Sequence, residues 1–262
     1  MKSLPARPTT PVAVLKLFEP LNSRAKELKQ RELARHGKAW ETRVRMANGF
    51  EAAVGLAQMQ MNVLQLSTMG ALFGRRADNP KEMIPIDFQK LTGITGDSDL
   101  KFVREVYEAT TRTSIVIQTQ FQVERMMSDL LRALALPVSA AFEDNARKLL
   151  TEAGVRAPHR KASWMYLPSL VRNTLHSGGF HDRASRQITL GDTTYVFDKG
   201  RRFAQAGWHH ITHMLSGELD VLEELLTSQK LLRLGLVPDR FAFLEFEGHL
   251  PRKSVYALSS SP

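Results

Sequence analysis

The sequence of 262 residues contains no cysteine. This absence excludes disulfide scaffolds, thiolate zinc sites, iron–sulfur clusters and cysteine nucleophiles. No secretion signal is expected either, because the first eleven residues carry three prolines and no apolar stretch of signal-peptide length. Together these absences predict a cytoplasmic protein, and its length allows a full hydrophobic core without covalent or metal support.

The sequence has fewer acidic than basic residues: 27 Asp and Glu against 36 Lys and Arg, which gives a net charge of +9. A basic balance favours anionic partners, either nucleic acid or a membrane surface. Most of the excess lies in residues 1–48, which hold 11 basic and four acidic residues. This segment is either a solvated helix face or an arm that contacts nucleic acid.

A charge-free run from Ala52 to Gly74 is long enough to suggest a membrane span. It contains six amide and hydroxyl side chains that would be costly in hydrocarbon, namely Gln58, Gln60, Asn62, Gln65, Ser67 and Thr68. We therefore expect a helix buried against other helices, and no integral membrane span. A structural or membrane-surface protein built around residues 20–74 is an alternative interpretation.

Helical patterns cover most of the remaining chain, so the expected fold class is mainly α. The expected helices span residues 22–46 with a break at Gly37, 100–136, 139–153 with Ser139 as N-cap, and 164–177. Prolines and glycines between residues 78 and 99 predict a connector.

After residue 186 the hydrophobic period changes from helical to alternating. The Gly191-Asp192 pair between two alternating runs predicts a small β-hairpin over residues 187–197. One long helix follows, with a regular apolar seam at Ala204, Trp208, Ile211, Leu215, Leu219, Leu222 and Leu226. The predicted organisation is a basic helical region with a connector (1–96), a helical bundle (97–230) and a C-terminal tail (231–262).

The most distinctive local feature is a polar edge on the helix expected at 164–177. Arg172 and His176 are four residues apart and lie one turn over each other, with Asn173 within reach. A permanently charged guanidinium beside an imidazole that titrates near neutrality is suited to phosphodiester cleavage. The histidine can move a proton while the arginine stabilises charge on the phosphate, so this chemistry needs neither a metal nor a cofactor.

The Arg172-Asn173 pair, His176 and the glycines behind them resemble the motif of the HEPN family (higher eukaryotes and prokaryotes nucleotide-binding domains). The hairpin and the long amphipathic helix that follow are similar too, and the resemblance covers roughly residues 97–229. It implies a helical bundle that acts as a metal-independent endoribonuclease, with Arg172, Asn173 and His176 as catalytic residues. It also implies RNA as substrate and an active site assembled across a homodimer. Because family members occur among toxins and phage-defence proteins, a cognate protein partner is implied as well.

The spacing of the motif leaves a second interpretation open. Three residues separate Arg172 from His176, which is shorter than the commonest family spacing. The alternative function is a catalytically inactive HEPN-like module that binds RNA, a nucleotide or a partner protein. In either case we expect Phe180 and Trp208 to flank the dimer interface.

Three further residues are candidate accessory groups. Glu124 is expected to orient Arg172 through a salt bridge, and His181 is a second histidine behind the motif. His209 either lines the RNA site or pairs with His213, four residues on, in the spacing of two zinc ligands. Because thiols and the glutamate of a zinc-protease helix are both missing, no metal site is expected.

Overall fold

Helices make up most of the computed structural model, which describes residues 3–8, 11–68, 73–75, 83–85 and 97–240. The helices are α1 (Pro11–His36), α2 (Thr42–Thr68), α4 (Asp97–Ala133), α5 (Phe142–Glu152), α6 (Pro158–His176), α7 (Trp208–Leu226) and α8 (Gln229–Arg233). The strands are β1 (Phe73–Arg75), β2 (Met83–Pro85), β3 (Arg186–Leu190) and β4 (Thr193–Phe197). The mainly α fold with a small antiparallel hairpin before the last long helix is therefore confirmed.

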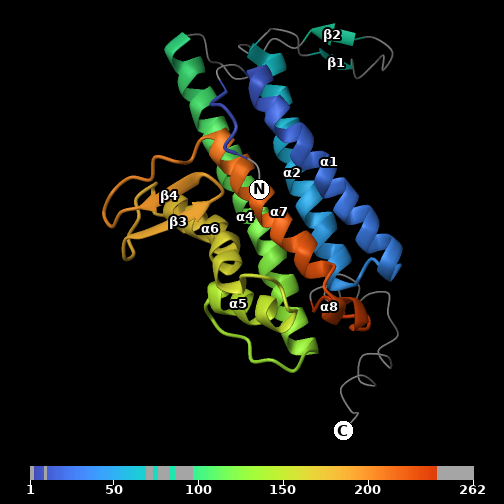
Figure 1. Cartoon of the computed structure of the whole chain (residues 1–262). Coiled ribbons are helices and arrows are strands. Elements are labelled where there is room, and N and C mark those ends of the chain that lie inside the picture. The colour runs from blue at the N-terminus through green and yellow to red at the C-terminus, as the bar shows by residue number, and fades with distance from the viewer. Residues whose placement is uncertain (1–2, 9–10, 69–72, 76–82, 86–96, 241–262) are drawn as a thin grey trace.

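The long helices form a bundle, with α1 and α2 on one side of α4 and α7 and with α6 on the other (Figure 1). α2 packs along both α1 and α4, α1 packs along α7, and α6 contacts α4, α5 and α7. One hydrophobic core runs through all of them and includes the fully buried side chains of Phe18, Phe50, Met126, Met165 and Leu215. The core therefore contains side chains from both sides of residue 96.

The N-terminal helices differ from the prediction in their bounds. α1 begins at Pro11, eleven residues before the predicted start, and ends before Gly37, whose φ of +62° confirms the expected break. The proline-rich start concealed this helix, because proline is tolerated in a first turn but disfavoured in a helix interior such as the position of Pro20. Burial of Val14 and Phe18 in the core compensates for that proline.

The uncharged segment after residue 51 is helical as expected up to Thr68, the end of α2, whereas Phe73 and Gly74 at its far end lie in β1 instead. Within α2 the apolar side chains at 53, 54, 57, 61 and 64 are all buried. In the part of the chain that the structure describes, no helix has the length and apolarity needed to cross a membrane. Most of the predicted connector between residues 78 and 99 lies outside the described residues.

The hairpin β3–β4 forms at the predicted place. Leu190 pairs with Thr193 across a two-residue turn. Gly191 in this turn has a φ of +64°, because the tight turns that join two-residue hairpins need a positive φ. Trp164 of α6 donates its Nε1–H to the carbonyl oxygen of Thr189 at 2.7 Å, which fixes the hairpin against the helix. A second two-stranded pair, β1–β2, was not predicted.

Two further predicted helix starts were wrong. α5 begins at Phe142 with Ala141 as N-cap, and Ser139 instead accepts a hydrogen bond from the Ala141 amide at 3.1 Å. α6 begins at Pro158, so Pro168 lies inside the helix rather than in its first turn. Tertiary packing of α6 against α4, α5 and α7 stabilises a longer helix than local propensity indicates.

A buried ion pair, which we call the Glu41–Arg43 network, joins the start of α2 to the segment after α7. Arg43 Nε donates to Glu41 at 2.6 Å, and its two Nη groups donate to the carbonyl oxygens of Leu231 and Gly235 at 3.0 and 2.8 Å. Glu41 also accepts from the backbone amides of Arg43 and Val44. The pair therefore has hydrogen-bond partners on both sides.

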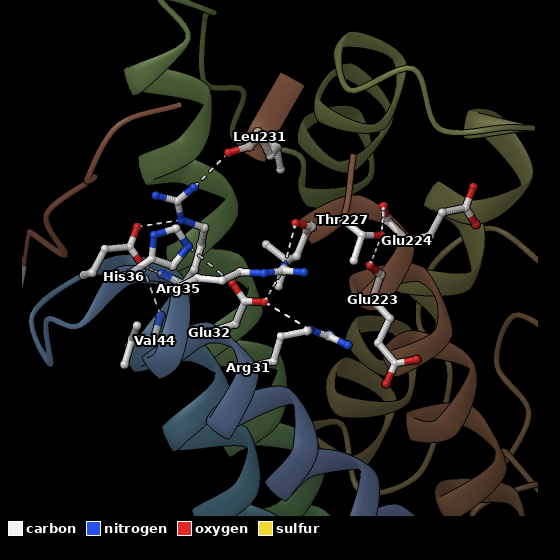
Figure 2. A network of polar contacts seen from close by, with 12 residues as sticks. Arg31, Glu32, Arg35, His36, Val44, Glu223, Glu224, Thr227 and Leu231 are labelled. Carbon is white, nitrogen blue, oxygen red and sulfur yellow. Dashed lines mark hydrogen bonds and ion pairs between the residues drawn. The ribbon is translucent and has the colours of Figure 1, made fainter. Parts of the chain in front are cut away.

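A second buried carboxylate lies close by, at the end of α1. Figure 2 shows Glu32 with Arg31, Arg35 and His36, whose nitrogens lie 3.2–3.4 Å from its carboxylate oxygens. The predicted tail is anchored in the same region through Asp239, which accepts hydrogen bonds from Arg125 at 2.6 and 2.8 Å. Residues 231–240 therefore pack on the bundle, and the rest of the tail lies outside the described residues.

Candidate functional site

The candidate site lies along the polar edge of α6. The predicted apolar stripe of this helix is buried, with exposures of 2% or less at Leu167, Leu170, Val171 and Thr174. Arg172 and Asn173 lie beside that stripe and are half-buried. The helix therefore places these two polar residues at the edge of its buried face, while the apolar residues are directed into the core.

Arg172 is held by an ion pair that crosses from α6 to α4. Its Nη1 donates to Glu124 Oε1 at 3.0 Å, and its Nε donates to Asn173 Oδ1 at 3.3 Å. The same Glu124 oxygen accepts hydrogen bonds from the Ser169 hydroxyl at 3.2 Å and the Gln120 amide at 3.4 Å. The predicted salt bridge between Glu124 and Arg172 is thus present, and it fixes the direction of the guanidinium plane.

A cavity of about 490 Å³ opens beside this ion pair, between α4, the first turn of α5 and α6. Arg172 and Asn173 line it together with Ser128, Tyr166 and Arg183. Two guanidinium groups and an amide are donors of the kind that bind phosphate oxygens. Arg183, which is exposed in the loop between α6 and β3, was not predicted, because no local pattern indicates it.

Three acidic residues line the cavity, and each has an arginine partner: Glu124 pairs with Arg172, Glu143 with Arg186 and Asp144 with Arg147. Glu143 accepts from Arg186 Nη1 at 2.8 Å and from the Ser163 hydroxyl at 2.9 Å. Burial by itself would raise the pKa of Glu143, but these hydrogen bonds and the Arg186 charge outweigh burial and lower it. Among the described residues no ion pair involves Arg183, so the cavity retains a positive charge that an anion can meet.

His176 is the last residue of α6, and its backbone lies one helical turn beyond Arg172. Its side chain lies outside the described part of the structure. Ser177 is the C-cap, and Gly178, with a φ of +67°, follows it and ends the helix as expected. The placement of His176 on the helix agrees with the predicted motif, and its role stays a prediction.

His181 is placed differently from the motif residues. Its side chain is 3% exposed, with Nδ1 3.3 Å from the Thr174 hydroxyl and Nε2 3.1 Å from the Ala184 carbonyl oxygen. Its ring also lies against Phe197 of the hairpin. His181 therefore connects α6 to the hairpin and does not line the cavity.

The histidines at the start of α7 form a separate cluster. Burial, and secondarily the charge of Arg7, lowers the pKa of His209, and burial together with the neighbouring histidines lowers the pKa of His210 to about 4. His213 is buried, and its Nδ1 lies 2.9 Å from the Tyr195 hydroxyl. His209 is not among the residues that line the cavity.

The described residues give the zinc interpretation no support. Within residues 3–8, 11–68 and 97–240, no group of three or more His, Asp or Glu side chains is arranged to hold a metal ion. His213, one of the two histidines of the predicted zinc spacing, also has its Nδ1 in a hydrogen bond with the Tyr195 hydroxyl.

One of the two expected dimer contacts is internal. Trp208 is only 3% exposed, because its ring packs on Phe18 of α1 at 5.2 Å and beneath the Arg112 guanidinium. The apolar seam of α7, to which Trp208 belongs, is directed into the core of the same chain. Phe180 is 52% exposed and is free to contact another molecule.

Two buried polar residues next to the site were not predicted to lie there. Gln120, one turn before Glu124 on α4, is fully buried. Glu218 of α7 is fully buried as well, and burial and the charge of Glu124 raise its pKa to about 8. The available signal was a glutamate inside the leucine seam of α7, at a position that the helical period turns inward.

Comparisons of the chain with protein-family models, with curated proteins and with solved structures find no match. The function therefore has to be argued from the site itself.

Proposed function

We propose that this chain is a metal-independent endoribonuclease of the HEPN type whose active site is the Arg172 cavity. The observation that supports this proposal is the Arg172 guanidinium, oriented by Glu124 at the wall of a cavity of about 490 Å³. Asn173 lies beside it, and the helix carries His176 one turn further on. These are donors for a phosphate and a group that can transfer a proton.

The reaction uses the RNA as its own nucleophile. The 2′-hydroxyl attacks the adjacent phosphorus, the bond from phosphorus to the 5′-oxygen breaks, and the products are a 2′,3′-cyclic phosphate and a 5′-hydroxyl. His176 takes the proton from the 2′-hydroxyl or returns one to the leaving oxygen. Arg172 stabilises the charge that grows on the phosphate, while Asn173 holds the guanidinium or a phosphate oxygen.

The direct test is cleavage of RNA in excess EDTA by the wild type and by Arg172→Ala and His176→Ala. Both variants should lose activity by roughly two or more orders of magnitude, the scale of a lost acid–base or charge-stabilising group. His159→Ala is the matched control, because it removes an exposed histidine from the other end of α6. Circular dichroism checks that each variant is folded.

Intact RNA after long incubation with folded wild-type protein would contradict the proposal. That result would favour the binding-module alternative, for which the short Arg172–His176 spacing is the supporting observation. RNA retention by the wild type and its loss in Arg172→Ala would then identify the same cavity as a binding site.

The homodimer is part of the proposal, because one motif supplies too few groups for both proton transfers. Mixing Arg172→Ala with His176→Ala subunits tests it. If each site takes its arginine from one chain and its histidine from the other, half of the sites in a heterodimer keep both residues and activity partly returns. Full activity of a protein that sediments only as a monomer would contradict the dimer.

A further inference from the structure

Glu218 is an acidic side chain placed where no acid should be stable in its charged form. It lies on α7 between Leu215 and Leu219, and its side chain has no exposed surface. Among the described residues neither of its carboxylate oxygens has a hydrogen-bond partner. An ionised carboxylate in such a place is costly, so the group is expected to carry a proton.

The charged neighbour of Glu218 on the facing elements is Glu124 of α4, with Arg172 of α6 behind it. On α7 itself, Asp220 and Glu223 turn the other way, because both bind Arg24 of α1 at 2.7 and 3.1 Å. Burial is the larger cause and the Glu124 charge the smaller cause of the raised pKa of Glu218, about 8. At neutral pH the acid is therefore neutral and able to donate a hydrogen bond.

The polar cluster around Glu124 lacks a donor. Gln120, whose Nε2 donates to Glu124, has a buried Oε1 without a partner among the described residues. A neutral Glu218 has one hydroxyl group able to donate a hydrogen bond, whereas an ionised Glu218 only adds another negative charge near Glu124. Its protonation state therefore changes what surrounds the carboxylate that holds Arg172.

We propose that Glu218 is a positioning residue for the Arg172 cavity: its protonated carboxyl group supports Glu124, and its ionisation disturbs the ion pair that orients Arg172. The ionised acid adds a second carboxylate beside Glu124 and attracts the guanidinium toward the core, away from a phosphate in the cavity. Activity at this cavity should then fall in mildly alkaline solution. The link to cleavage rests on the proposed function, but the link to Arg172 does not.

The experiment compares the wild type with Glu218→Gln, Glu218→Leu and Glu224→Gln. Glutamine has the shape of the protonated acid and cannot ionise, whereas leucine removes the polar group and fills the space. Glu224→Gln is the matched control, since it neutralises a partly exposed glutamate on the same helix. The first measurement is carbon-13 NMR of the glutamate carboxyl groups, with the Glu218 signal assigned by its loss in Glu218→Gln.

The wild-type Glu218 signal should titrate near pH 8, and the nitrogen-15 signal of the Arg172 side chain should shift with the same midpoint. In excess EDTA the wild-type cleavage rate should fall above that midpoint, by up to roughly tenfold per pH unit. Glu218→Gln should keep its rate in that range, Glu218→Leu should be several-fold slower at neutral pH, and Glu224→Gln should follow the wild type.

Either of two results overturns the inference. One is a Glu218 carboxyl group that titrates in the ordinary range of glutamate, and the other is an Arg172 signal that does not respond to its titration. If RNA is cleaved, a Glu218→Gln profile that falls like that of the wild type overturns it as well. If none of the proteins cleaves RNA, the proposed function fails, and the two NMR titrations still decide the role of Glu218.

Discussion

Two polar regions inside this bundle differ in how their charges are compensated. In the Glu41–Arg43 network, both partners are fully buried and the pair also bonds to the backbone of α2 and of the segment after α7. At the Arg172 cavity, Arg172 and Glu124 are half-buried, and the fully buried Glu218 has no hydrogen-bond partner in the part of the chain that the structure describes. Buried charged groups that have all their hydrogen-bond partners stabilise one conformation. Buried groups that lack partners can change their protonation state or their contacts when the pH changes or a ligand binds.

The largest effect should come from breaking the satisfied pair. Arg43→Ala leaves Glu41 charged and buried, so we expect a loss of about 3–5 kcal/mol in the free energy of unfolding, measured by urea denaturation. The control is Arg147→Ala, whose partner Asp144 is well exposed, and it should cost less than about 1 kcal/mol. Equal losses in the two variants would show that the network is not the stabilising unit described here.

The next effect should come from the unsatisfied carboxyl group. Because the pKa of Glu218 in the folded protein, about 8, lies above its ordinary value, the folded state binds a proton that the unfolded state has released. This contribution to stability is fully present below about pH 4.5 and is lost as the pH rises to about 8, with a slope of up to about 1.4 kcal/mol per pH unit.

Glu218→Gln removes that proton uptake. The difference in free energy of unfolding between variant and wild type should therefore grow from about pH 5 to pH 8 and then level off. Thermal or urea unfolding across this range measures it, with Glu224→Gln as the exposed control. A difference that does not depend on pH would mean that Glu218 is ionised in the folded protein.

A smaller effect separates the structural histidine from the motif. His181→Ala removes the contacts to Thr174 and Ala184, which should cost about 1–3 kcal/mol. Cleavage per folded molecule should stay at the wild-type level, because His181 is outside the cavity. Loss of cleavage at unchanged stability would instead place His181 in the reaction.

The smallest effect distinguishes two equivalent serines on α6. Ser169 and Ser163 each donate to a carboxylate, Glu124 and Glu143 respectively. Substitution of either by alanine should cost about 1–2 kcal/mol in the free energy of unfolding. Only Ser169→Ala should also slow cleavage, by a few-fold, because only Glu124 orients Arg172. Equal cleavage rates in the two variants would show that Arg172 does not need that hydrogen bond.

Much of the fold could be read from local pattern. The hairpin at Gly191 and the apolar seam of α7 follow from the spacing of apolar residues within each segment. The starts of α1 and α6 could not be read in this way, because prolines near them suggest breaks and only burial against distant helices overrides that preference. The pairing of Glu124 with Arg172 was predictable as a candidate, since both side chains lie on polar helix edges.

The sequence by itself determined the mainly helical class, the hairpin, and the turn of α6 that carries Arg172, Asn173 and His176. Each of these depends on residues within a few positions of one another, where backbone geometry dictates which side chains share a face. Only the tertiary structure decided that Trp208 and His181 are internal, that Arg183 and Tyr166 join the cavity, and that Glu218 is buried near Glu124. Those outcomes depend on which helices meet in space, and desolvation of a side chain is a property of its neighbours rather than of its own segment.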